Sequence, residues 1–299
     1  MPVHVWGEGP LEACPASAEA APVLAGRDAE AGGTWFGVNP GKRRFAVVTN
    51  WREPNDNGPA KARSRGELVS RYLYGESASA KAFANAAVRE GEHYRGFNLV
   101  VGTWEVSRGA VAADAWLASN RGTTAAAGSA EPWPLDGGAD GEARAVSNGD
   151  ASDDAPPWPK CRRGLRRART LLERMADNMT DLASVARALI GEVLWDAAVP
   201  DVETDGPRPN TGVPEEWEEQ LRAVFVDAVK AEYGTRSNQA LLVAPDGSGV
   251  LVERHWDADR TNGDTLHPSP RGGSWRWVEH KFDAGGHTTR LTQEPSSLV

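Results

Sequence analysis

Hydrophobic and polar residues alternate along two runs in the first third of the chain. Residues 34–38 and 45–50 place large apolar side chains at every second position, which is the period of a half-buried strand. Residues 39–42 (NPGK) between them favour a turn. We therefore predict a β-hairpin here. The same period predicts a strand at 97–104 and a partner strand at 111–119.

Other segments carry apolar residues at helical spacing. Residues 64–75 and 79–92 each show an apolar stripe, so both predict amphipathic helices. Ser64, followed three positions later by Glu67, predicts a capping box at the first of them. Residues 182–193 predict a further helix on the same grounds.

Residues 159–176 also predict a helix, and one of its faces is strongly basic. Such a face could bind phosphate or an acidic lipid, but a solvated face is the more common role of a charge run, and we favour it. The face carries Arg162, Arg163, Arg166, Arg167 and Arg169.

The last part of the chain returns to the strand period. Residues 235–244 and 249–256 flank 245–248 (PDGS), a strong hairpin signal, and 274–282 adds one more strand. Strands at both ends with helices between them predict a layered α+β domain with antiparallel sheets.

We predict a single domain over residues 1–299 that carries two surface insertions. The first covers residues 10–21. The second covers 123–157, where Gly, Ala, Asp, Ser and Pro dominate and the periodicity stops, apart from a short predicted strand at 144–147.

Composition limits the possible functions. Hydrophobic content of 40% and charged content of 25% are typical of a globular protein, and a net charge of −9 argues against a broad nucleic-acid surface. No stretch approaches the roughly 20 apolar residues that a membrane-spanning helix needs, so we expect no transmembrane segment. A cytoplasmic location is the default expectation, and the oligomeric state stays open.

Cysteine, histidine and tryptophan offer few candidate sites. Cys14 and Cys161 do not make a disulfide framework, although the cations beside Cys161 could lower the pKa of its thiol. The six histidines show no zinc-binding spacing, so we expect no metal. The 12 tryptophans could line a flat apolar cleft, but for Trp35 and Trp104 we predict core filling.

Six short segments follow one another along the chain and together form a recognisable pattern. They are 32–38 (GGTWFGV), 49–54 (TNWREP), 63–69 (RSRGELV), 96–101 (GFNLVV), 209–212 (PNTG) and 233–238 (YGTRSN). In this order they resemble the NRDE family, the relatives of Transport and Golgi organisation protein 2. The resemblance covers roughly residues 3–256.

The resemblance implies an N-terminal-nucleophile (Ntn) hydrolase-like αββα sandwich that lacks its first strand. In that fold the side chain of the first residue is the nucleophile, whereas this chain begins Met1-Pro2. By resemblance, Asn50, Asn148 and Arg236 take the polar roles in the cleft. Taken alone, each has a plainer explanation, namely a strand end, a turn and a structural ion pair.

The resemblance implies two alternative functions. The first is a non-catalytic protein that binds a small apolar ligand, haem or an acyl lipid, and acts in haem or lipid trafficking or in secretory-pathway organisation. It would use no cofactor, with haem possible as a ligand, and a mitochondrial or Golgi address is conceivable. The alternative is a cysteine-type amide-bond hydrolase whose start, Met-Cys and Asn-Arg-Asp-Glu, lies upstream of this chain.

Overall fold

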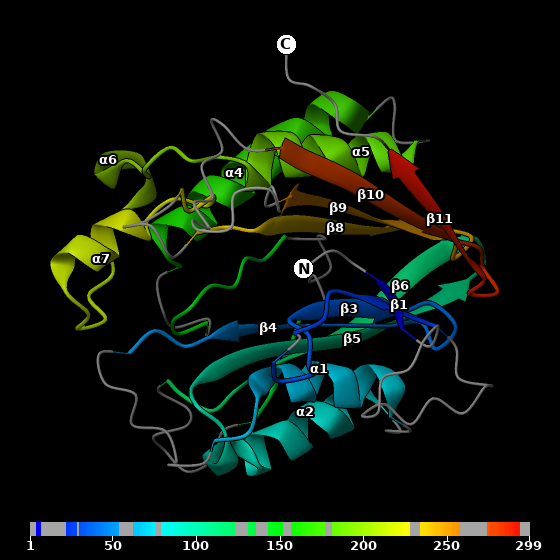
Figure 1. Ribbon diagram of the computed structural model, residues 1–299, viewed down its shortest axis with the longest axis horizontal. Coiled ribbons are helices and arrows are strands. Elements are labelled where there is room, and N and C mark those ends of the chain that lie inside the picture. The colour runs from blue at the N-terminus through cyan, green and yellow to red at the C-terminus, as the bar shows by residue number, and fades with distance from the viewer. Residues whose placement is uncertain are drawn as a thin grey trace.

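Two antiparallel sheets lie face to face in the computed structural model, and helices cover the outer side of each (Figure 1). The predicted α+β class with antiparallel sheets is therefore confirmed. The structure describes residues 4–6, 22–28, 30–53, 62–75, 79–122, 131–135, 143–151, 157–176, 181–227, 234–257 and 274–293.

The first sheet has seven strands, and each pairs with the strands before and after it in the chain. The predicted hairpin and the pair β5–β6 are confirmed. Their register joins Gly37 to Ala46 and Val101 to Trp116. The strands β1, β2 and β7 are too short to show a period. The seven are β1 (His4–Trp6), β2 (Val23–Ala25), β3 (Phe36–Asn39), β4 (Arg44–Asn50), β5 (Phe97–Ser107), β6 (Ala110–Ser119) and β7 (Trp133–Pro134).

The second sheet has four strands in the order β11-β10-β9-β8. The predicted C-terminal hairpin and the strand after it are confirmed. A fourth strand, β11, was not predicted because its sequence is mostly polar. The four are β8 (Ser237–Val243), β9 (Gly249–Asp257), β10 (Ser274–Phe282) and β11 (Thr288–Gln293).

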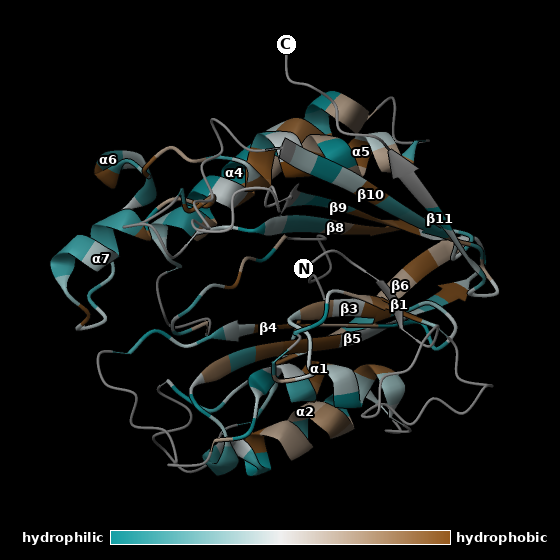
Figure 2. Ribbon diagram, in the orientation of Figure 1, coloured by the Kyte–Doolittle hydropathy of each residue, from teal (hydrophilic) through white to brown (hydrophobic). Residues whose placement is uncertain are grey.

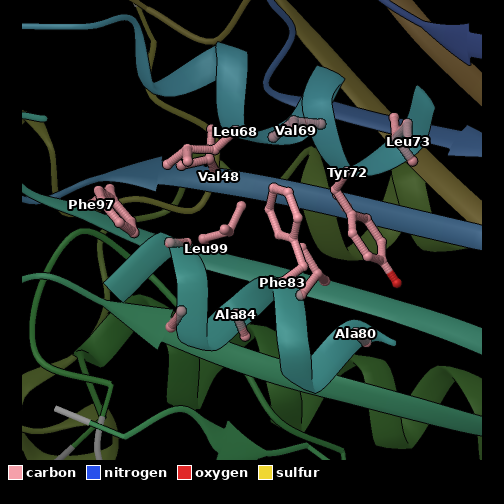
Figure 3. Close-up of a cluster of buried hydrophobic side chains, with 14 of the residues drawn as sticks. Val48, Leu68, Val69, Tyr72, Leu73, Ala80, Phe83, Ala84, Phe97 and Leu99 are labelled. Carbon is pink, nitrogen blue, oxygen red and sulfur yellow. The ribbon is translucent and has the colours of Figure 1, made fainter. Parts of the chain in front are cut away.

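Helices α1 (Arg65–Tyr74) and α2 (Ala80–Arg89) cover the first sheet and bury a dry core against it (Figure 3). Ser79 caps α2 by accepting a hydrogen bond from the backbone of Ala82 at 3.1 Å. The predicted capping box of α1 is wrong, since Ser64 makes no such bond. Glu67 instead pairs with the side chain of Arg63.

Two of the six segments meet where α1 begins. A Cβ atom on Gly33 would lie 2.5 Å from the carbonyl carbon of Gly66, and the Thr34 amide donates to the Gly66 carbonyl at 3.3 Å. Real Cβ atoms do not come so close, so the crossing of segments 32–38 and 63–69 requires glycine. These two segments therefore have a structural explanation.

The helices above the second sheet are less regular. α4 (Pro159–Met175) is long, whereas the predicted helix over 182–193 is confirmed as α5 (Leu182–Ala188) followed by the π-helix η3 (Leu189–Leu194). The wider π turn is often found at functional sites. Two short helices follow, α6 (Val202–Asp205) and α7 (Glu215–Gln220), and Figure 2 shows α7 as hydrophilic along its length.

The basic face of α4 is engaged in ion pairs. Arg163 lies 2.6 Å from Asp196, and Arg166 lies 2.6 Å from the fully buried carboxylate of Asp205. Burial alone would raise the pKa of Asp205, but the hydrogen bond and charge of Arg166 outweigh it and hold that pKa below its usual value. Much of the face that we predicted to be solvated therefore binds, through ion pairs, the acidic segment that follows η3.

The predicted insertions are only partly within the described residues. Segment 10–21 and residues 123–130, 136–142 and 152–156 lie outside them, so the domain boundaries stay a prediction. Residues 143–151 are described and pack against β4 and β5, but they form no strand, so the strand predicted at 144–147 is wrong. The described helices include no candidate membrane-spanning segment.

Candidate functional site

Asn50 and Asn148 meet where β4 ends. The Asn148 side chain donates a hydrogen bond to the backbone carbonyl of Asn50 at 2.8 Å, and the Asn148 carbonyl accepts from the Arg52 amide at 2.6 Å. The Asn50 side chain itself is exposed. The structure thus brings the two residues together through the Asn50 backbone rather than its amide side chain.

Hydrogen bonds from side chains of β4 and β5 hold the segment around Asn148 in place. The buried side chain of Asn98 donates to the carbonyls of Ser147 and Gly149 at 3.0 and 2.7 Å, and the Thr49 hydroxyl donates to Ser147 at 2.8 Å. Gly149 lies flat against the ring of Trp158, where a Cβ would be 2.4 Å from the ring. Segments 49–54 and 96–101 therefore both serve to hold residues 147–149.

A cavity of about 520 Å³ opens between this segment, α4, η3 and β8, and we name it the α4 cavity. Most of its lining is apolar, and no acidic residue is among the described residues that line it. Thr49, Ser147, Asn148 and Gln239 supply hydroxyl and amide groups. Its size and its mixture of apolar walls with a few polar groups are typical of small-molecule sites. The apolar lining includes Leu165, Ala168, Leu189, Val193, Leu194 and Leu241.

Lys160, in the first turn of α4, lines the α4 cavity. Burial, and next the charge of Arg52, lower the pKa of its amine to about 8. Its Nζ donates to the Leu221 carbonyl at 3.1 Å. The amine is still mostly protonated at pH 7 but loses its charge far more easily than an exposed lysine.

Cys161 follows Lys160 and lies between the α4 cavity and a smaller one of about 260 Å³ on the other side of residues 143–149. Burial raises the pKa of its thiol, which is opposite to the lowering that neighbouring cations could have caused. The neighbouring arginines point to Asp196 and Asp205 and not to the sulfur. Cys14 lies outside the described residues.

A buried ion pair borders Lys160. Arg52 lies 2.7 Å from Glu218 of α7, and its guanidinium lies 4.8 Å from the ring centre of Trp158. Thr211 donates a hydrogen bond to the other Glu218 oxygen. Segment 209–212 therefore contributes Thr211 to the site. Segment 49–54, which also holds residues 147–149, contributes Arg52.

Arg236 lies in a second, adjoining cavity of about 640 Å³, which we name the Arg236 cavity. The two cavities share Leu194 and Gln239 as wall residues. Trp35 also lines the Arg236 cavity and is 51% exposed, so its predicted core role is wrong. Trp35 lies just before β3 and is therefore not part of the alternation of buried and exposed side chains along that strand. Trp104, by contrast, is buried in the core between the sheets, as predicted.

Two of the three sequence-predicted residues line two neighbouring cavities, and the third lines neither. Asn148 lines the α4 cavity, Arg236 lines the Arg236 cavity, and Asn50 supports Asn148 without lining either. Their joint role in one cleft stays a prediction. Sequence reasoning missed Lys160 and Glu218. For Lys160 a signal existed, because it is one of six lysines in a chain that strongly favours arginine.

Metal-binding geometry is not found in this part of the molecule. No group of three or more His, Cys, Asp or Glu side chains suited to a metal ion occurs among the residues that the structure describes. The polar side chains that line the α4 cavity carry hydroxyl, amide, amine, guanidinium and thiol groups and no carboxylate, which suits an organic ligand better than a hard cation.

Comparison with known proteins agrees with the pattern of segments. The chain is similar to the Transport and Golgi organization protein 2 homolog of Bos taurus, with 28% identity over 240 residues, 78% of this chain and 76% of that protein. The mouse protein of that kind is 27% identical over 241 residues, 78% of this chain and 76% of its own length. The human homolog is 28% identical over 251 residues, 79% of this chain and 80% of its own length.

The profile of one family, described as Transport and Golgi organisation 2, matches residues 10–258. These residues include all six segments and both cavities. The chain therefore belongs to the Transport and Golgi organisation 2 family.

Proposed function

We propose that this protein binds a small apolar ligand, haem or an acyl lipid, in the α4 cavity without transforming it. The observation that carries the proposal is the α4 cavity, an apolar space of about 520 Å³. Four of the six segments contribute to its surroundings, since 49–54 and 96–101 fix its floor, 209–212 supports Glu218, and 233–238 leads into β8. A set of segments shared by a family and gathered at one cavity is what a binding site would require.

The family name favours a role in transport or in organising the secretory pathway. Haem or lipid trafficking would fit a protein that encloses an apolar ligand, because such ligands need protection from water. A Golgi or mitochondrial address belongs to the same proposal. We also propose that the four layers are an Ntn-type arrangement, since two antiparallel sheets packed between helices are what that fold requires.

Binding is the stronger candidate compared with amide hydrolysis. Hydrolysis would need a thiolate or an activated hydroxyl facing the ligand. Within the described residues the thiol that lines the α4 cavity is that of Cys161, and burial raises its pKa, which opposes thiolate formation. The hydrolase alternative would therefore need the upstream cysteine that the resemblance implies.

Filling the α4 cavity tests the proposal. Gly164 lies on α4 and lines the cavity, and a Cβ atom there would have no other atom within 4 Å. Gly164→Leu should therefore fill the space and also raise the stability of the helix by up to about 1 kcal/mol. We expect this variant to lose binding of haem or acyl-CoA, measured by quenching of tryptophan fluorescence, while it unfolds no more readily than the wild type.

Gly191→Leu is the matched control. Gly191 is exposed on η3, and a Cβ there also has open space. Binding should be unchanged in this variant. Loss of binding in Arg236→Ala but not in Gly164→Leu would move the site to the Arg236 cavity, and saturation of the wild type by neither ligand would refute the proposal.

A further inference from the structure

Charge is distributed unevenly around the α4 cavity. Its described lining contains two cations, Lys160 and Arg144, and no carboxylate. Glu218, whose charge acts on Lys160, lies 2.7 Å from Arg52 and accepts a hydrogen bond from Thr211. The cavity is therefore a mostly apolar space whose described charged lining groups are positive.

The amine of Lys160 is held in place on this wall. Its Nζ donates to the Leu221 carbonyl and lies 5.9 Å from the ring centre of Trp158. An ammonium group has three donors, so this contact leaves donors for a ligand. The thiol of Cys161 and the hydroxyls of Thr49 and Ser147 are close by along the same lining. Thr49 already donates its hydroxyl proton to the Ser147 carbonyl, and Ser147 donates to the Asn148 side chain, so it is the ammonium group that would meet an anionic oxygen.

We propose that Lys160 anchors the carboxylate of an aliphatic acid whose hydrocarbon chain lies in the α4 cavity. This inference rests on the proposed function and names the ligand class for the same site. A neutral chain would gain the apolar contacts alone, whereas an acid also gains a charge-assisted hydrogen bond from the ammonium group. The walls formed by Leu165, Leu189 and Val193 suit the chain, and the absence of a lining carboxylate among the described residues favours the anion.

The amine of Lys160 also gives the site a pH dependence. The charged groups around it are Arg52 after β4, Glu218 on α7 and Arg144 on the facing segment, with the Cys161 thiol beside it on α4. Since the pKa of Lys160 is about 8, the ammonium is the main form at pH 7 and is progressively lost above pH 8. An aliphatic acid is ionised throughout this range. Its affinity should fall as the pH rises, and that of a neutral chain should not.

Calorimetric titration with decanoate and decan-1-ol tests the inference, because the two differ only in the head group. We expect the wild type to bind decanoate about tenfold or more tightly than the alcohol at pH 7. Lys160→Met, which keeps an apolar stem, should reduce decanoate affinity to that of the alcohol and leave the alcohol unchanged. Lys160→Arg should keep most of the preference. Decanoate binding to Lys160→Met should no longer depend on pH between 7 and 10.

Arg169→Met, an exposed position on the same helix, is the control for loss of a positive charge and should change neither affinity. Equal affinities of the wild type for the acid and the alcohol would overturn the inference and leave the proposed function intact. So would a Lys160→Met variant that binds both ligands more weakly by the same factor. If the wild type binds neither chain and no haem, the proposed function fails as well.

Discussion

The two outer layers of the molecule are built differently. Below the first sheet, α1 and α2 bury Leu68, Tyr72 and Phe83 against Phe97 and Leu99 in a core without charged side chains (Figure 3). Around the second sheet, charged side chains are buried as well, among the described residues. These include Glu253, Arg254, His255 and Glu279. Both layers consist of helices packed on an antiparallel sheet. The contrast therefore lies in the side chains that are buried between the helices and strands.

Buried charge near the second sheet is paired at some cost in stability. Glu279 lies 2.8 Å from Arg187 of α5, Glu253 accepts a hydrogen bond from Gln239 at 2.8 Å, and the guanidinium of Arg254 lies 3.6 Å from the ring centre of Trp195. Buried ion pairs contribute little net stability compared with apolar packing. A region that keeps such groups near its cavities, as Glu253 is through Gln239, is a better candidate for function than the apolar core of the first layer. The contrast teaches that the first layer serves as scaffold and the second as binding layer.

The largest expected effect comes from breaking the scaffold. Phe97→Ala should lower the free energy of unfolding by about 3–5 kcal/mol, because Phe97 is fully buried between α1, α2 and the first sheet. Urea titration would measure the loss. The folded fraction should still bind decanoate with unchanged affinity. Weakened binding in folded Phe97→Ala protein would show that the two layers are coupled.

A smaller loss is expected from the buried pair beside the α4 cavity. Glu218→Ala leaves Arg52, only 12% exposed, without its carboxylate, which should cost about 3 kcal/mol in unfolding free energy. Glu215→Ala on the same helix removes an exposed pair with Arg208 and should cost at most about 0.5 kcal/mol. Similar losses in the two variants, by urea unfolding, would mean that the Arg52 pair is no more than a surface contact.

The smallest of these effects concerns the contact between α4 and α6. Arg166→Leu leaves the buried carboxylate of Asp205 with its remaining hydrogen bond from the Asp201 amide, and should cost about 1–2 kcal/mol at pH 7. The folded-state pKa of Asp205 lies below its unfolded value of 3.8. The contribution is therefore complete above that value and is lost as the pH falls through the folded-state pKa.

Unfolding at several pH values checks this sign. The difference between wild type and Arg166→Leu should be largest at pH 7 and shrink below about pH 4. Arg169→Leu, at an exposed position on the same helix, should show little difference at any pH. A difference that grew on acidification would contradict the assignment of Asp205 as the titrating group.

The elements that the sequence predicted well are those with local patterns. The hairpin β3–β4, the helices α1 and α2 and the hairpin β8–β9 each carry a period long enough to read over 7–10 residues. The strands β1, β2 and β7 have only two or three residues, and their existence depends on partners elsewhere in the chain. The capping-box prediction was wrong because the Glu67 carboxylate forms an ion pair with Arg63, while the Ser64 side chain makes no capping hydrogen bond.

The candidate site was predicted less completely than the fold. The resemblance named Asn50, Asn148 and Arg236 for one cleft but gave no contacts between them, and the position of Lys160 depends on how α4 packs against residues 143–149. The ion pair of Arg52 with Glu218 joins residues 166 positions apart. No periodicity encodes such a contact, so only the folded arrangement could identify the amine and its surroundings.

A crystal structure with bound decanoate tests the central claim most directly. We expect the hydrocarbon chain between α4, η3 and β8, with a carboxylate oxygen within hydrogen-bond distance of the Lys160 amine, about 2.7–3.2 Å. Decanoate bound beside Trp35 in the Arg236 cavity, or seated in the α4 cavity with its carboxylate turned away from Lys160, would contradict it.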